Sequence, residues 1–216
     1  MRSLALVSAF VWLAAAACTR SNPSATSSSA TPVPAPSDGG GAEPAAGGCP
    51  PSWTAAPAVD GALAVPAGSG GVLLRARAVG TQNYECKALP GDAGPGHAWT
   101  FVGPQANLTD CHGAPIGTHF ASAAGPTAPE WLELDGTTYV IAKKLAAATP
   151  DGGAPAVPWL LLQATSTSGA GTLAKTKYVQ RLNTTDGVAP ASGCDATAVG
   201  QTRRVAYGAD YYFYGD

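Results

Sequence analysis

The 216-residue chain carries 12 basic and 14 acidic side chains, which gives a net charge of −2, and only 12% of its residues are charged. It has no block of basic residues that could neutralise a phosphate backbone, so we expect no nucleic-acid partner. The low charge, together with 27 glycines and 19 prolines, fits an exported β protein better than a cytosolic enzyme.

The first segment has the pattern of an export signal. Arg2 precedes an apolar run over residues 4–17, which is too short to span a bilayer as a mature helix and ends in small residues. Cys18 directly follows "LAAAA", which resembles the lipobox of bacterial lipoproteins. The resemblance implies a signal peptide over residues 1–17 and a covalent lipid on Cys18. A secreted protein, cleaved after an Ala-x-Ala pattern, is the alternative.

Residues 18–48 would then be the lipidated cysteine and a disordered linker rich in Ser, Ala, Pro and Gly. This stretch has a single branched aliphatic residue, Val33, and no aromatic residue, so it cannot form a core. Because Thr19, and not an aspartate, follows the cysteine, we expect a lipid-anchored location in the cell envelope, at the outer membrane. Residues 49–216 have the size of one ordinary domain.

Alternating apolar and polar residues predict a chain of short strands within residues 49–216. Turn signals rich in Gly, Pro, Asn and Asp separate several of them. One stretch, residues 139–148, is compatible with a strand or a short helix, and the strand is favoured. The predicted strands cover residues 71–80, 81–89, 97–103, 117–122, 129–134, 137–145, 158–166, 173–184 and 203–215. Eight or nine such strands indicate an all-β fold, a single antiparallel β-sandwich or barrel.

The cysteines indicate disulfides. If Cys18 is lipidated, four cysteines remain, and in an oxidising compartment two disulfides are the expected state. Three pairings of four cysteines are possible. No CxxC or HxxxH spacing occurs, so a structural zinc site is not expected. The remaining cysteines are Cys49, Cys86, Cys111 and Cys194.

Six segments occur in a recognisable order: "GTQNYECKA", "WTFVGPQANLTDCHGAPIGTHFA", "WLELDG", "PWLLLQATSTSGAG", "VQRLNTTDGVAPASGC" and "YGADYYFY". In this order they resemble an uncharacterised family, the domain of unknown function 3455. The resemblance implies a typically exported protein, and the family's Tyr-x-Cys and Gly-Cys elements correspond to Cys86 and Cys194. It therefore favours a Cys86–Cys194 disulfide, which leaves Cys49 for Cys111. It implies no activity, because none is established for the family.

One histidine is the main candidate for chemistry. His119 is followed in the family pattern by a tryptophan and an Asp-Gly pair, here Trp131, Asp135 and Gly136, so His119, Trp131 and Asp135 could line a ligand pocket. Two simpler interpretations are favoured: His119 as a buried, hydrogen-bonded imidazole, and Asp135-Gly136 as a hairpin turn. No metal site is expected, although Asp110, His112 and His119 would be the best candidate ligands.

The C-terminal strand offers two aromatic faces, Tyr211 with Phe213 and Tyr212 with Tyr214. One face should pack in the core, and the other could form the rim of the core or an exposed platform for a carbohydrate or a partner. We expect a non-catalytic binding or envelope-interaction module, with no cofactor beyond the lipid and an envelope component or glycan as partner. The alternative is an extracytoplasmic enzyme of unassigned class, with metal dependence as one option, using His119 with a nearby carboxylate.

Overall fold

The computed structural model describes residues 48–59, 61–90, 96–150 and 155–216. The predicted signal peptide, Cys18 and the predicted linker up to residue 47 lie outside the described residues. Within the described ranges, no helix has the length and hydropathy needed to cross a membrane.

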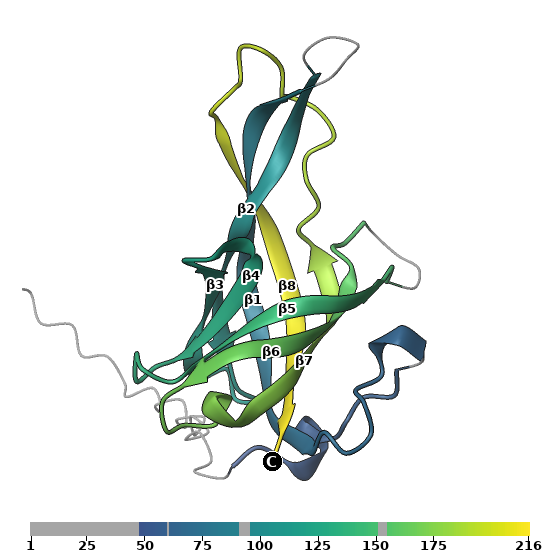
Figure 1. Cartoon of the computed structure of the whole chain (residues 1–216), viewed down its shortest axis with the longest axis vertical. Coiled ribbons are helices and arrows are strands. Elements are labelled where there is room, and N and C mark those ends of the chain that lie inside the picture. Colours follow the sequence, from purple (N-terminus) through teal and green to yellow (C-terminus); the bar gives the residue numbers. More distant parts are fainter. Residues whose placement is uncertain (1–47, 60, 91–95, 151–154) are drawn as a thin grey trace, which may run out of the picture. The chain divides into compact units, whose positions relative to one another are not determined.

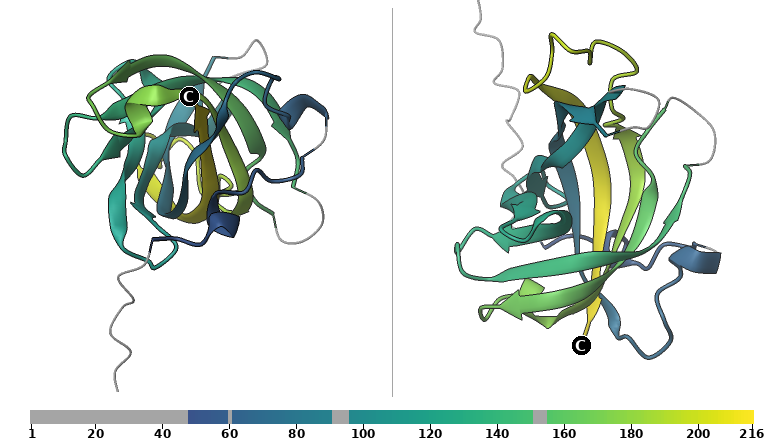
Figure 2. Two further views of the ribbon diagram at one scale, coloured as in Figure 1. Left: turned by 90° about the horizontal axis from the view of Figure 1, so that it is seen from below. Right: turned by 45° about the horizontal axis from the view of Figure 1, so that its top comes forward.

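Eight antiparallel strands form a closed barrel in which each strand pairs with the next and the last pairs with the first (Figure 1 and Figure 2). The strands are β1 (Gly71–Leu89), β2 (Gly96–Thr109), β3 (Pro115–Ser122), β4 (Gly125–Glu133), β5 (Tyr139–Ala148), β6 (Trp159–Ser168), β7 (Thr176–Asp186) and β8 (Thr202–Gly215). Short 3₁₀ helices are η1 (Pro51–Thr54), η2 (Gly61–Leu63) and η3 (Leu173–Lys175). The all-β prediction is confirmed, and the sheet is a barrel.

Two local predictions are resolved by the strands. Residues 139–148 form strand β5, as favoured. The two strands predicted for residues 71–80 and 81–89 are one long strand, β1, which has β2 on one side and β8 on the other. Position 80 of this strand requires glycine, because β2 approaches closely there. An added Cβ would lie 2.1 Å from the backbone oxygen of Gln105.

The interior of the barrel is filled by side chains that alternate along the strands. In β8, Tyr211 and Phe213 point into the main core, and both are almost completely buried. Large rings fit because small residues share the same core cluster and leave room for them. These small residues are Ala76, Ala78, Ala106, Ala142 and Ala209.

The other face of β8 is covered. Tyr212 and Tyr214 belong to a second cluster, outside the barrel, which contains Leu63 of η2. Gln180 joins the two layers, because its Nε2 donates to the Leu63 carbonyl at 2.7 Å and its Oε1 accepts from the Tyr214 hydroxyl at 2.7 Å. The two tyrosines are 5% and 6% exposed. The alternative of an exposed aromatic platform at this strand is therefore wrong.

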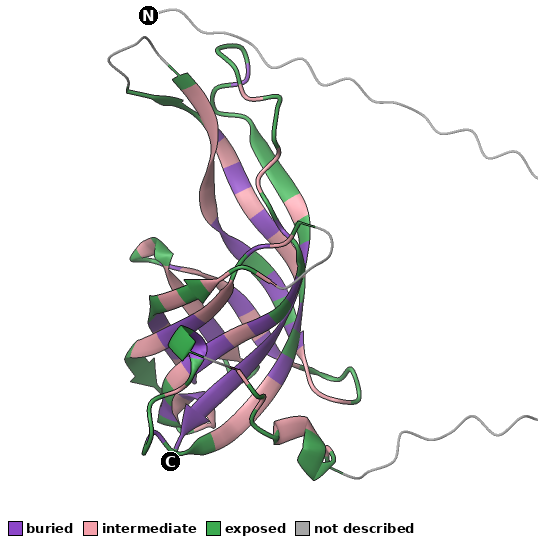
Figure 3. Ribbon diagram, turned by 90° about the vertical axis from the view of Figure 1, so that its right-hand side faces the viewer, coloured by how far each residue is buried: buried purple, intermediate pink, exposed green. Residues whose placement is uncertain are grey.

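Strands β1 and β2, the start of β8 and the segment between β7 and β8 extend past the barrel as an arm, defined here as residues 83–89, 96–101 and 187–204 (Figure 1 and Figure 3). A register shift at Asn83 and Tyr84 marks the point where β1 enters the arm. The Cys86–Cys194 disulfide ties β1 to the loop that precedes β8. The second disulfide, Cys49–Cys111, ties the segment before η1 to the β2–β3 turn. These are the two pairs that the family resemblance favoured.

Candidate ligand-binding cavity

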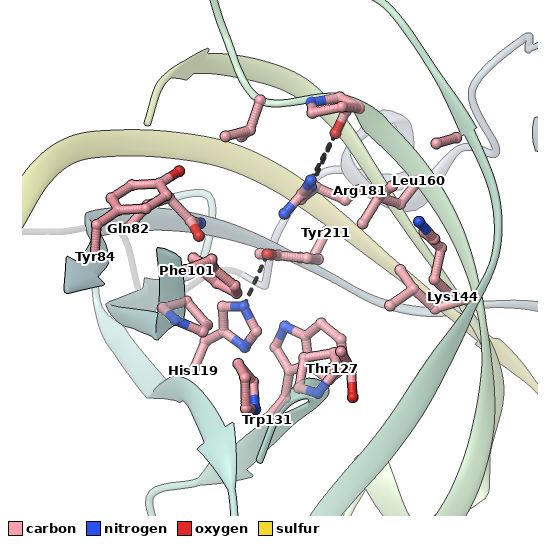
Figure 4. A pocket seen from close by; sticks show the side chains of 17 residues that line it. Gln82, Tyr84, Phe101, His119, Thr127, Trp131, Lys144, Leu160, Arg181 and Tyr211 are labelled. Atoms are coloured by element: carbon pink, nitrogen blue, oxygen red, sulfur yellow. Dashed lines mark hydrogen bonds between the residues drawn. The ribbon is translucent and has the colours of Figure 1, made fainter. Parts of the chain in front are cut away.

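A cavity of about 320 Å³ lies inside the barrel, at the end nearest the arm (Figure 4). Each of the eight strands contributes at least one side chain to its wall. One from each strand, in chain order, are Gln82, Phe101, His119, Trp131, Lys144, Leu160, Arg181 and Tyr211. The mouths of β-barrels are common places for small-molecule sites.

The wall is mainly apolar. Phe101, Leu160 and Leu162 supply part of it, and four prolines are also among the lining residues. The prolines are Pro104, Pro126, Pro129 and Pro158. Rigid rings of this kind keep a cavity open without the loss of side-chain entropy that flexible residues would suffer on ordering.

His119 is fixed in the wall by hydrogen bonds at both ring nitrogens. Nδ1 lies 2.9 Å from the backbone oxygen of Glu130, and Nε2 lies 3.0 Å from the Tyr211 hydroxyl. A carbonyl oxygen can only accept, so Nδ1 carries the proton and Nε2 accepts from Tyr211. The Tyr211 oxygen then accepts from the Tyr207 hydroxyl, 2.6 Å away. The hydrogen bonds therefore run in one direction: Tyr207 donates to Tyr211, Tyr211 donates to His119, and His119 donates to the backbone.

The same histidine belongs to an aromatic cluster. Its ring stacks on Trp131 with centroids 4.6 Å apart and planes within 7°, and Tyr211 meets both rings edge-on at 5.0 and 5.2 Å. Burial lowers the pKa of His119 to about 3, so the imidazole is neutral near pH 7. Burial also raises the pKa of Tyr207 and of Tyr211, which keeps both hydroxyls protonated.

Two buried donors in the wall have no hydrogen-bond partner among the described residues. They are the amide Nε2 of Gln82 and the indole Nε1 of Trp131, in side chains that are 2% and 1% exposed. Both residues line the cavity. Buried donors in folded proteins are nearly always paired, so two unpaired donors on residues that line one cavity favour a site for acceptor atoms nearby.

The charged side chains of the wall are both cationic. Arg181 is held by the Pro158 carbonyl, which accepts from Nε at 3.1 Å and from Nη2 at 2.8 Å. Lys144 is exposed at the mouth. No aspartate or glutamate is among the lining residues, and neither cation makes an ion pair within the described part of the chain.

Of the three predicted pocket residues, two meet in the cavity and one does not. His119 and Trp131 are directly opposite on β3 and β4. Asp135 lies in the β4–β5 turn, where its carboxylate accepts from the backbone N–H of Thr137 and Thr138 and from the Thr138 hydroxyl. These bonds lower the pKa of Asp135 to about 2. Gly136 completes the turn with φ of +70°. The geometry agrees with the turn interpretation, and Asp135 does not line this cavity.

The three candidate metal ligands do not converge. Asp110 and His112 lie in the β2–β3 turn, where Asp110 Oδ1 accepts from the backbone N–H of His112 at 2.8 Å, whereas His119 is in the cavity wall. In the described ranges, the side chains close enough to share an ion are Cys49, Cys111 and His112. Since the two cysteines form a disulfide, their sulfurs are not thiolates that could bind a metal.

The enzyme alternative required a carboxylate beside His119. The structure instead places a backbone carbonyl and a tyrosine hydroxyl at its two nitrogens, and the cavity wall contains no acidic side chain. A carboxylate–histidine pair is therefore not formed in this cavity.

Sequence reasoning missed Gln82, Lys144 and Arg181. A signal for Arg181 was present, because it follows the core residue Val179 by two positions and so faces the interior of the barrel. Nothing local distinguishes Gln82, which lies in a long strand with polar residues on both sides.

The fold is a closed antiparallel barrel with an internal cavity. The chain belongs to the family described as "Protein of unknown function (DUF3455)", whose family model matches residues 66–215. The match begins after η2, so the segment that covers Tyr212 and Tyr214 precedes the matched region. No curated protein and no solved structure matches the chain.

Proposed function

We propose that this protein is a non-catalytic binding module, held at the cell envelope by a lipid on Cys18, whose barrel cavity binds a small molecule. The observation that carries the proposal is the cavity of about 320 Å³ with an apolar wall and two buried, unpartnered donors. Its volume is at the lower end of the range of about 300–1,000 Å³ that is typical of ligand pockets. An envelope component or a glycan fragment is the expected source of the ligand.

The state of the titratable groups supports binding over catalysis. A general base works best when its pKa lies near the operating pH. The pKa of His119 is lowered to about 3, and both of its nitrogens are already in hydrogen bonds. The tyrosine hydroxyls of the same chain have raised pKa values, so they are poor nucleophiles. These groups hold the wall in shape.

The location rests on the sequence of the first segment. The apolar run before Cys18 and the lipobox-like "LAAAA" favour export and lipidation, and Thr19 favours the outer membrane. Residues 18–48 would act as a spacer between the anchor and the barrel. Secretion without a lipid is the alternative location.

The anchor is tested with Cys18→Ala. A radioactive fatty acid should label the wild type in growing cells and leave the variant unlabelled, and the variant should move from the membrane to the soluble fraction. Unlabelled wild-type protein in the soluble fraction would exclude the lipid anchor.

Binding is tested with the full chain carrying Cys18→Ala, which removes the proposed lipid. The neutral probe 2-naphthalenemethanol should bind, as measured by calorimetry. Ala147→Trp, at an exposed position of the cavity wall, should block the mouth and abolish binding. Ala196→Trp, at an exposed position outside the lining, is the control and should bind normally. Equal binding by both variants would place the probe elsewhere and contradict the proposal.

A further inference from the structure

We infer that the cavity selects a small organic anion, a molecule with an apolar ring body and a carboxylate. The inference rests on the proposed function and adds the class of ligand to it. Its first support is the sign of the wall charges: Arg181 and Lys144 line the cavity, and no acidic side chain does. An anion entering this site meets two positive charges and no carboxylate that would repel it.

Arg181 is positioned before any ligand arrives. Its two bonds to the Pro158 carbonyl fix the guanidinium, and its cross-strand neighbours are Leu160 on β6 and Tyr211 on β8. Figure 4 shows Arg181 beside Tyr211, with His119 beyond the tyrosine ring. A fixed, planar guanidinium matches a carboxylate better than a mobile ammonium does, because its donors lie in one plane and lose less entropy on binding.

The buried donors supply the second, independent support. Gln82 Nε2 and Trp131 Nε1 are unpartnered although their side chains are at most 2% exposed. A buried donor without an acceptor is unfavourable, and an oxygen of the ligand would supply the missing partner. Tyr211 cannot serve in their place, since its proton is already given to His119. The acceptor atoms of the ligand are thus expected next to Gln82 and Trp131.

The remaining wall determines the body of the ligand. Phe101 and Trp131 present aromatic surface, and four prolines present flat aliphatic surface. Such walls favour a rigid ring over a polar chain. A volume of about 320 Å³ accommodates a molecule no larger than a few fused rings. These features together describe an aromatic carboxylate.

The test uses three probes of one shape and different charge, 2-naphthoate, 2-naphthalenemethanol and 2-naphthylmethylamine, with the full-length Cys18→Ala protein. Calorimetry at low ionic strength should show 2-naphthoate binding at least tenfold more tightly than the alcohol, and the amine most weakly. The affinity of 2-naphthoate should fall as salt is added, because an ion pair is screened.

Matched variants locate the effect. Arg181→Gln should weaken 2-naphthoate at least tenfold and leave the alcohol nearly unchanged, whereas Arg204→Gln, an exposed arginine outside the lining, should change neither. Lys144→Met should weaken the binding of 2-naphthoate. Lys143→Met, at the neighbouring exposed lysine that does not line the cavity, should leave this binding unchanged. Gln82→Met should weaken 2-naphthoate without lowering the unfolding midpoint, because an unpaired amide is replaced by an apolar side chain of similar length. If Arg181→Gln does not fold, the Lys144 and Gln82 variants carry the test.

Two outcomes overturn the inference in different ways. If the alcohol binds as tightly as 2-naphthoate, or if the cavity variants bind 2-naphthoate like their controls, the selection of anions is refuted and the proposed binding function stands. If none of the three probes binds at millimolar concentration, both the inference and the proposed small-molecule function are refuted.

Discussion

His119 and Trp131 are cross-strand partners on β3 and β4, and their rings lie in parallel contact, with centroids 4.6 Å apart. Both side chains are at most 2% exposed, and both line the cavity. A structural histidine and a pocket histidine were alternative expectations from the sequence. In the structure His119 has both features. Its imidazole is buried, stacked and hydrogen-bonded in the core, and the same side chain lines the cavity.

His119→Gln should lower the free energy of unfolding by about 1–3 kcal/mol, the cost of disturbing a buried polar group. Glutamine can replace one of the two ring-nitrogen hydrogen bonds but cannot stack on Trp131 as an imidazole does. Urea unfolding, followed by tryptophan fluorescence, measures the change. His97→Gln, at a half-buried position outside the cavity wall, is the control and should cost less. An unfolding midpoint unchanged by His119→Gln would show that the buried histidine adds nothing to stability.

The low pKa of His119 predicts a pH dependence of stability. The pKa is about 3 in the folded protein and about 6.5 when unfolded, so between these values the unfolded state binds more protons. Stability from this group is therefore complete above about pH 6.5 and is lost as the pH falls toward 3. Between pH 6.5 and 4 the loss should be on the order of 3 kcal/mol.

The difference between wild type and His119→Gln isolates this contribution. The groups packed around the ring are the Glu130 carbonyl, Tyr211, Trp131 and the more distant charge of Arg181. Burial raises the pKa of the Glu130 carboxyl, which gives a slope of opposite sign that both proteins share. Asp135, with a pKa of about 2, acts only below about pH 4. Equal slopes for wild type and variant between pH 4 and 6.5 would refute the assignment.

Gly187 lies where the chain leaves β7 and passes the cavity, and it accepts a hydrogen bond from the Tyr84 hydroxyl at 2.6 Å. Its φ is +81°, and an added Cβ would lie 2.9 Å from Gln82 Cγ and 3.2 Å from Val157 and Tyr207 atoms. Gly187→Ala should therefore combine backbone strain of about 1–2 kcal/mol with displacement of the cavity wall.

Gly113→Ala is the matched control for Gly187→Ala. Gly113 has a nearly equal φ of +79°, but an added Cβ there meets nothing within 4 Å. We expect the Gly113 variant to show the backbone strain alone, and the Gly187 variant to lose more stability and to bind 2-naphthoate more weakly. Equal unfolding midpoints for the two variants would mean that the space around Gly187 is not tight.

Removal of the Cys86–Cys194 disulfide should be costly. The two cysteines are 108 residues apart, and the chain-entropy model assigns a loop of that size about 4–5 kcal/mol as an upper value. Cys86→Ser/Cys194→Ser should thus lower the free energy of unfolding by a large fraction of a typical domain stability of about 5–15 kcal/mol. Denaturant titration measures it, and a loss below about 1 kcal/mol would show that the arm contributes little to folding.

The sequence by itself determined the local structure. Alternation of apolar and polar residues located the strands, including residues 139–148, and Asp135-Gly136 identified a turn. These features depend on neighbours within a few positions, such as Asp135 with the N–H groups of Thr137 and Thr138. Local hydrogen bonds and a period of two are visible in the order of residues.

Tertiary structure alone decided which of these strands share a cavity. Gln82 and Arg181 line one wall because β1 pairs with β8, β8 pairs with β7, and the sheet closes on itself. The alternation that predicts a sandwich also predicts a barrel, since both have one buried face per strand. Closure and register are set by the summed packing of all eight strands, so they leave no mark within any one segment.

The same limit explains the aromatic face of β8. The alternation correctly separated Tyr211 and Phe213 from Tyr212 and Tyr214, but it could not show that the second face is buried as well. Leu63 covers it from more than a hundred positions earlier in the chain, through Gln180 on a third element. A contact over such a distance depends on where the completed barrel leaves apolar surface to cover, and only the folded structure contains that information.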